Sequence, residues 1–143
     1  MQRNQNTTHP ISQTLALVSL LTFALCLGFV GTPSEAPQAH VHVEDFAGGE
    51  DPQDHTIQIQ RALDHANGLG RPVVVHFQPN KCYYVSKHGG GTPGVMPFAL
   101  KISNASSITL AGHGAELRCT DRESMMLFVE NSSHIKVRNL RFD

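Results

Sequence analysis

Two stretches of the chain decide its fold, LKISNASSITL at residues 100–110 and LFVENSSHIKV at residues 127–137. The second repeats the first with an offset of 27 residues. Each even-numbered position of the first stretch has an identical or similar residue in the second, such as Asn104 with Asn131, whereas the odd-numbered positions differ. Because alternate side chains of a strand lie on the same face, one face is kept constant while the other varies.

A repeat of this length is typical of proteins built from stacked units. The sequence therefore predicts an all-β fold, a parallel β-solenoid in which each repeat lies above the previous one. The expected stacked pairs are Leu100 with Leu127, Ile108 with Ile135, and Leu110 with Val137. The alternative is a β-sandwich with a chance internal similarity.

A helix is expected ahead of the repeats. One apolar stripe with helical spacing is formed by Ile59, Ala62, Leu63 and Ala66. Asp54 is a suitable N-cap, and Gly68 and Gly70 are typical of a helix end. These features predict a helix over 55–67 that would cover the open apolar end of the solenoid.

The first 36 residues have the three parts of a secretory signal peptide. An apolar run from Leu15 to Val30 follows a polar start, and Ser34-Glu35-Ala36 supplies a small-x-small cleavage site. We expect cleavage after Ala36, with an uncleaved anchor and a buried core helix as alternatives. The mature protein, a linker at 37–40 and a domain at 41–143, would then be secreted, periplasmic or extracellular, with no membrane association.

Composition and charge exclude one class of partner. The chain has 40% hydrophobic residues, as folded proteins do, and its 11 Lys and Arg against 12 Asp and Glu give a net charge of -1. That balance lacks the basic excess that binding to nucleic acid requires, so we expect no nucleic-acid partner.

Residues 41–143 resemble a known group of proteins. The stretches VEDFA at 43–47, IQRALD at 59–64, VVV at 73–75 and NLRFD at 139–143 carry the resemblance. They are similar to the N-terminal segment of the pectate-lyase-like superfamily, the right-handed parallel β-helix group that contains polygalacturonases and related glycoside hydrolases.

The resemblance implies a secreted carbohydrate-active protein, most simply a polygalacturonase-like glycoside hydrolase that cleaves a polysaccharide. Its catalytic coils would follow Asp143, so the chain is expected to be truncated at its C-terminal end and inactive alone, and no catalytic residue is carried over. A polysaccharide lyase, a non-catalytic glycan-binding or adhesin module and an inert truncated product are the alternatives. No cofactor is expected, with calcium only in the case of a lyase.

The basic residues Lys136, Arg138 and Arg141 are candidates for binding an acidic polysaccharide such as a uronate, because they alternate on the last strand. A solvated face is the simpler interpretation. The same strand carries apolar side chains that nothing later in the chain covers, so self-association through this uncapped end is also expected.

Four further residues are weaker candidates. Cys82 and Cys119 could form a disulfide or be two separate buried thiols. Asn104 and Asn131 begin glycosylation sequons, which matter in a eukaryotic secretory route.

We consider the histidines as metal ligands. His40 and His42 share a strand face, but no third ligand follows at a suitable spacing, so no metal site is predicted. His76 is interpreted as an edge or satisfied core histidine, and His113 as a turn residue between two glycines.

Overall fold

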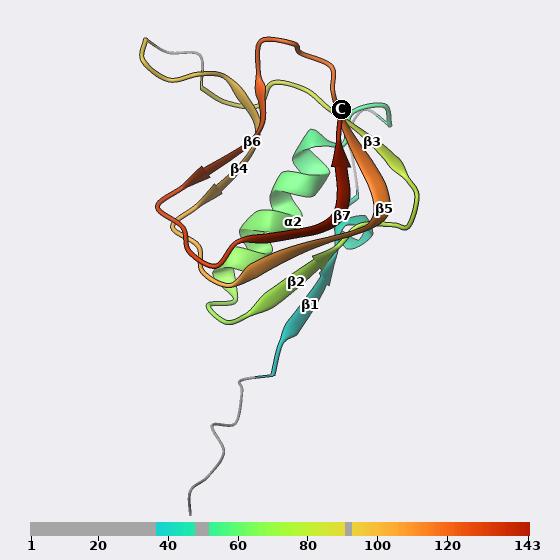
Figure 1. The fold of residues 1–143 in the computed structure, drawn as a ribbon, viewed down its shortest axis with the longest axis vertical. Helices are drawn as coiled ribbons and strands as arrows, with labels where there is room; N and C mark the ends of the chain where they lie inside the picture. The colour runs from blue at the N-terminus through green and yellow to red at the C-terminus, as the bar shows by residue number, and fades with distance from the viewer. Residues whose placement is uncertain (1–36, 48–51, 91–92) are drawn as a thin grey trace, which may run out of the picture. The chain divides into compact units, whose positions relative to one another are not determined.

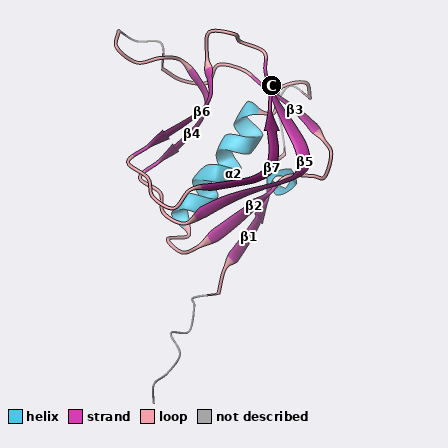
Figure 2. Ribbon diagram, in the orientation of Figure 1, coloured by secondary structure: helices cyan, strands magenta, loops and turns pink. Residues whose placement is uncertain are grey.

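The computed structural model describes residues 37–47, 52–90 and 93–143, and the predicted signal peptide at 1–36 lies outside them. Strands dominate the described residues (Figure 2). The elements are β1 (Ala39–His42), η1 (Val43–Phe46), α2 (Thr56–Gly68), β2 (Val73–His76), β3 (Cys82–Val85), β4 (Phe98–Ser103), β5 (Ile108–Cys119), β6 (Met125–Glu130) and β7 (Lys136–Phe142). None of the helices in the described part of the chain is long and apolar enough to cross a membrane.

All ladders between these strands are parallel. In the larger sheet, called sheet A, the order is β1-β2-β5-β3, and β7 also pairs with β5 (Figure 1). Strand β5 pairs with β2 through residues 108–111 and with β3 through residues 116–119, while β7 follows it along both halves. Sheet B consists of β4 and β6. The expected all-β, parallel architecture is therefore confirmed.

The repeat in the sequence is also the register of the strands. Leu100 pairs with Leu127 in sheet B, and Leu110 pairs with Val137 in sheet A. Between these two ladders, Ser106 pairs with Ser133 in an isolated parallel bridge. The same offset of 27 residues thus runs through both sheets and the turn between them, as the sequence predicted.

The turns repeat with the strands. Asn104 and Asn131 have φ values of 53° and 46°, and Ser107 and His134 have φ values of 59° and 55°. All four lie in the left-handed region, which Asn tolerates better than most residues. The conserved Asn of the repeat therefore marks the position where the chain turns out of sheet B.

Helix α2 forms as predicted, displaced by one residue at each end. It contacts β4 of sheet B on one side and β1 and β2 of sheet A on another (Figure 1). The four residues of its predicted apolar stripe are at most 2% exposed. They join a core whose largest fully buried side chains are Tyr83, Phe77, Leu100, Ile108 and Leu117.

One expected boundary was wrong. Part of the predicted linker at 37–40 belongs to β1, because Ala39 and His40 pair with Val73 and Val74 of β2. Strand β5 is bent, since its register with β7 shifts between Ala111 and Ala115 without ending the pairing.

Candidate functional site

The most distinctive surface of the protein is the outward face of sheet A. Strands β1 and β2 and the first part of β5 alternate buried residues with more exposed ones, and β7 is exposed at most positions. The outward side chains of these strands form rows across the sheet. The first row is His40, Val74, Thr109 and Lys136. The second row is His42, His76, Ala111 and Arg138. We call these two rows the basic face.

Three histidines of this region are linked through their ring nitrogens. Nδ1 of His40 lies 2.9 Å from Nε2 of His76, and Nδ1 of His76 lies 3.0 Å from Nε2 of His113. The ring centres of these pairs are 5.2 Å and 5.3 Å apart, and the planes are tilted by 20° and 10°. In each pair, the distance between ring centres is longer than the nitrogen–nitrogen distance by about the width of one ring. The two nitrogens therefore lie between the ring centres, and the rings meet edge to edge. We call His40, His76 and His113 the imidazole chain.

The position of each ring follows from local structure. His42 and His76 are direct cross-strand partners, and their rings stack with centres 4.9 Å apart. His113 lies at the bend of β5, where its φ of 51° and the flanking Gly112 and Gly114 turn the backbone. The bend brings its ring within hydrogen-bond distance of that of His76.

Burial and neighbours both oppose a charge on the central ring. Desolvation lowers the pKa of His76, and the nearby His42, His40 and His113 lower this pKa further because a positive charge on any of them repels another. The pairwise, edge-to-edge contacts fit a shared hydrogen between two nitrogens. A metal ion would instead need several nitrogens converging on one point at about 2 Å. Consistently, no set of three or more His, Cys, Asp or Glu in the described part of the chain is arranged to hold a metal ion.

An acidic margin borders the histidines. A hollow of about 400 Å³ is lined by His42, His76 and His113 on one side and by Glu44 and Asp45 on the other. The Glu44 carboxylate accepts a hydrogen bond from the Tyr83 hydroxyl and lies 3.7 Å from Nζ of Lys81. Burial raises the pKa of Tyr83, and the bond to Glu44 raises this pKa further. Glu44 is thus held by two partners, whereas Asp45 is exposed.

The structure separates the three basic residues that the sequence grouped. Lys136 and Arg138 both lie exposed on the basic face. Arg141 lies beyond the bend of the sheet, and its Nη1 is 3.6 Å from Oε2 of Glu116. The expected single face of three cations was therefore wrong, because the register shift in β5 and the positive φ of Asn139 turn the strand before Arg141.

The two cysteines are both free thiols, partly buried. They lie on neighbouring strands, but Cys82 pairs with Glu116 and Cys119 pairs with Val85. Cys82 and the partner of Cys119, Val85, are therefore three residues apart along β3. An odd number of residues also places their side chains on opposite faces of the sheet, so this arrangement does not form the disulfide that the sequence left open.

The sequon asparagines and most carboxylates lie away from the basic face. Asn104 and Asn131 are exposed on the turns after β4 and β6, where an attached sugar would meet solvent. Several carboxylates are engaged: Glu116 with Arg118, Glu130 with Lys101, and Asp121 with Ser124. In the described residues, no pair of free carboxylates is brought together on the basic face.

Sequence reasoning missed the imidazole chain. It placed His40 and His42 on one face and treated His76 and His113 separately. The available signal was parity: each of these strand histidines alternates with buried valines, which points its ring outward. No protein-family model matches this chain, and a search of curated proteins finds no relative.

Proposed function

We propose that this chain is the N-terminal part of a secreted carbohydrate-active protein of the right-handed parallel β-helix kind, and that its basic face binds an acidic polysaccharide. The polygalacturonase-like glycoside hydrolases remain the group that it resembles. In this proposal the chain supplies the helix-capped first coils and a binding surface, and residues beyond Asp143 would supply cleavage.

The strand register supports the β-helix part of the proposal. An offset of 27 residues relates β4 to β6 and the first halves of β5 and β7. A constant offset in parallel ladders on two sheets is what one coil stacked on another would produce. Helix α2 covers the core at the β1 end, as a terminal cap of a solenoid does.

The single observation that carries the binding part is the placement of Lys136 and Arg138. They stand two residues apart on β7, so their backbone positions are separated by about 6.6 Å along the strand. Each lies in the same cross-strand row as a histidine of β1, His40 for Lys136 and His42 for Arg138. A cation-bearing sheet face suits a polymer with carboxylates at regular intervals, because opposite charges attract along its length.

The engaged carboxylates favour binding without cleavage by this chain. Glycoside hydrolysis needs two carboxyl groups about 5–9.5 Å apart on one groove. Asp45 is exposed at the margin of the basic face, but its neighbour Glu44 is held by Tyr83 and Lys81. We therefore expect no turnover of polygalacturonate by the chain alone.

Binding to polygalacturonate tests the proposal. The double variant Lys136→Ala/Arg138→Ala should weaken binding by about tenfold, since exposed ion pairs contribute up to about 1 kcal/mol each. Arg141→Ala is the control because it removes an exposed cation that lies off the basic face. Equal losses for the control and the double variant, or equal binding to neutral dextran, would contradict the proposal.

Export is tested separately. Mass spectrometry of protein recovered outside the producing cell should find an N-terminus at Pro37 or within a few residues of it. Recovery of only the uncleaved chain from membranes would favour the anchor instead.

A further inference from the structure

We propose that the imidazole chain is a proton-controlled anion site, which makes the basic face bind acidic polysaccharide in mildly acidic solution and release it near neutral pH. This inference rests on the proposed function, and it names the condition under which the face is occupied. It is carried by the geometry of the His40, His42 and His113 rings, each of which contacts the ring of His76.

The hydrogen bonds of the chain limit the protons that it can hold. A neutral imidazole has one N–H donor and one acceptor nitrogen. His76 directs both ring nitrogens at neighbours, Nε2 to His40 and Nδ1 to His113. Three neutral rings therefore form two hydrogen bonds that run in one direction, and neither contact places two donors or two acceptors against each other.

One added proton can be held at the centre of the chain, but burial and the neighbouring rings lower the pKa of His76, so this proton is taken up only in acidic solution. A protonated His76 would donate from both nitrogens, to His40 and to His113, and both bonds would become charge-assisted. A second proton, on either outer ring at the nitrogen now accepting, would place two donors against each other at about 3 Å. Further protonation must therefore open a contact and turn an imidazolium toward solvent.

The surrounding charges decide what stabilises the protonated chain. On the β1 side lies His42, whose ring stacks on His76, and beyond it lie Glu44 and Asp45 of η1. On the other side Lys136 and Arg138 lie one strand past β5, about 10 Å from His76 at ordinary strand spacing. The ammonium group of Lys81 forms an ion pair with the Glu44 carboxylate. Two cations thus lie on the β7 side of the histidines, and Glu44 and Asp45 are the carboxylates that line the hollow beside them among the described residues.

An external polyanion supplies the charge that the face lacks. Histidine changes charge between about pH 5 and 8, whereas uronate carboxylates stay ionised at about pH 5, as carboxylic acids with pKa values near 4 do. Lys136 and Arg138 stay charged throughout that range. Acidification therefore adds charge to the face and leaves the polymer anionic, and binding must in turn draw protons onto the histidines.

The experiment measures binding of the full chain to polygalacturonate at about pH 5 and about pH 7.5 by calorimetry in two buffers with different ionisation enthalpies. We expect affinity to rise by about tenfold or more at the lower pH, with a net uptake of protons. His76→Gln should reduce this ratio severalfold. His88→Gln, which removes an exposed histidine away from the face, should leave the ratio unchanged.

A second variant tests the proposal even if His76→Gln fails to fold. His42 is exposed, so His42→Lys should fold and should place a permanent charge beside His76. It should raise the affinity near neutral pH and flatten the pH dependence. NMR of the ligand-free chain should show the His76 ring taking up a proton over the same acidic range in which the affinity rises.

The outcomes are distinct. Equal affinity at both pH values, or an equal effect of His88→Gln and His76→Gln, would overturn this inference and leave the proposed function standing. Stoichiometric binding of Ni²⁺ or Zn²⁺ that displaces the ring protons would also overturn it, in favour of a metal site. Absence of polygalacturonate binding at either pH, with His76 still taking up a proton in acidic solution, would overturn the proposed function itself.

Discussion

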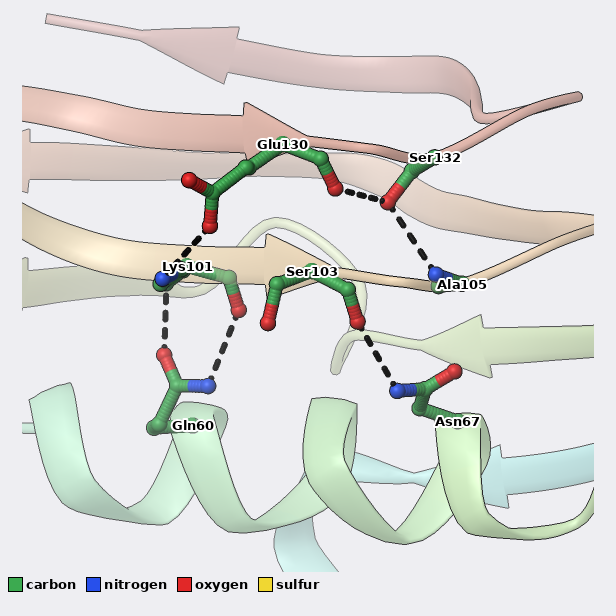
Figure 3. Close-up of polar contacts among 7 residues, drawn as sticks. All are labelled: Gln60, Asn67, Lys101, Ser103, Ala105, Glu130 and Ser132. Atoms are coloured by element: carbon green, nitrogen blue, oxygen red, sulfur yellow. Dashed lines mark hydrogen bonds and ion pairs between the residues drawn. The ribbon is translucent and has the colours of Figure 1, made fainter.

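Gln60 of α2 forms two hydrogen bonds with the backbone of Lys101 in β4 (Figure 3). Its Nε2 donates to the Lys101 carbonyl at 2.9 Å, and its Oε1 accepts from the Lys101 N–H group at 2.8 Å. A neighbouring strand would satisfy the same two backbone groups. The side-chain amide of Gln60 therefore ends sheet B on the side opposite β6, and Asn67 repeats the device by donating to the carbonyl of Ser103 at 3.1 Å.

Replacing this amide should destabilise the protein. Gln60→Leu keeps the size of the side chain but leaves an N–H and a carbonyl of Lys101 without their partners, which should lower the free energy of unfolding by about 1–3 kcal/mol. Urea unfolding measures the change as a lower midpoint at constant slope. Gln78→Leu, at an exposed loop glutamine, is the control and should cost less than about 0.5 kcal/mol. Equal midpoints for the two variants would contradict the capping role.

The paired leucines of the repeat should differ in cost. Leu100 is 2% exposed, whereas its register partner Leu127 is only partly buried. Leu100→Ala should lower the free energy of unfolding by about 2–5 kcal/mol, because it leaves a cavity in the core. Leu127→Ala should cost about half as much or less, since solvent already reaches that position. A larger loss at Leu127 than at Leu100 would show that the core is not centred on β4.

The bend of β5 depends on a glycine. A methyl group at position 112 would lie 2.3 Å from the Asn139 carbonyl oxygen and 2.5 Å from Cα of Leu140, both backbone atoms. Gly112→Ala should therefore destabilise by about 1–3 kcal/mol or more. Gly68→Ala is the matched control, because nothing lies within 4 Å of a methyl group there. It should be neutral or stabilise by up to about 1 kcal/mol through loss of backbone freedom in the unfolded chain. Thermal unfolding of the pair distinguishes the two effects, and similar shifts would refute the close approach of β7.

Asp54 should make stability depend on pH in acid. Burial alone would raise the pKa of Asp54, but hydrogen bonds from Ser86 and Thr56 outweigh that effect and lower the pKa below its value in the unfolded chain. The stabilisation is therefore present above the unfolded pKa, near 4, and is lost as pH falls through the folded pKa.

Asp54→Asn tests this contribution. The variant should be less stable near neutral pH and should lose less stability than the wild type on acidification below about pH 4. Denaturant unfolding at several pH values measures the difference. Asp64→Asn is the control, because Asp64 accepts from Gln60 on the surface of α2 and its replacement leaves the Asp54 bonds in place. Parallel pH profiles for wild type and Asp54→Asn would contradict the assignment.

The apolar side chains of β7 should drive self-association. Val137 and Phe142 are 42% and 43% exposed, and within the described residues β7 pairs only with β5. Large exposed apolar groups beside an unpaired strand edge favour contact with a second copy. Sedimentation at tens of micromolar should show dimers or larger species, and Val137→Lys should shift the protein toward monomer. Lys87→Ala serves as the surface control. A monomeric wild type would contradict this expectation.

The sequence determined the parallel register without help. The parity of matches between residues 100–110 and 127–137 gave the offset of 27, and the structure pairs Leu100 with Leu127 and Leu110 with Val137 accordingly. The stripe from Ile59 to Ala66 similarly predicted α2. Both signals are local or internally repeated, because burial of one face constrains residues at fixed spacing.

Only the tertiary structure decided the candidate site. The histidines at 40, 76 and 113 are far apart in the chain, and each looks ordinary in its own strand or turn. They meet because β1 pairs with β2 across the intervening helix and because β5 bends at Gly112, which also moves Arg141 away from Lys136 and Arg138. Pairing between unrelated strands leaves no repeat in the sequence, so neither the ring contacts nor the separation of the cations could be obtained before the strands were placed side by side.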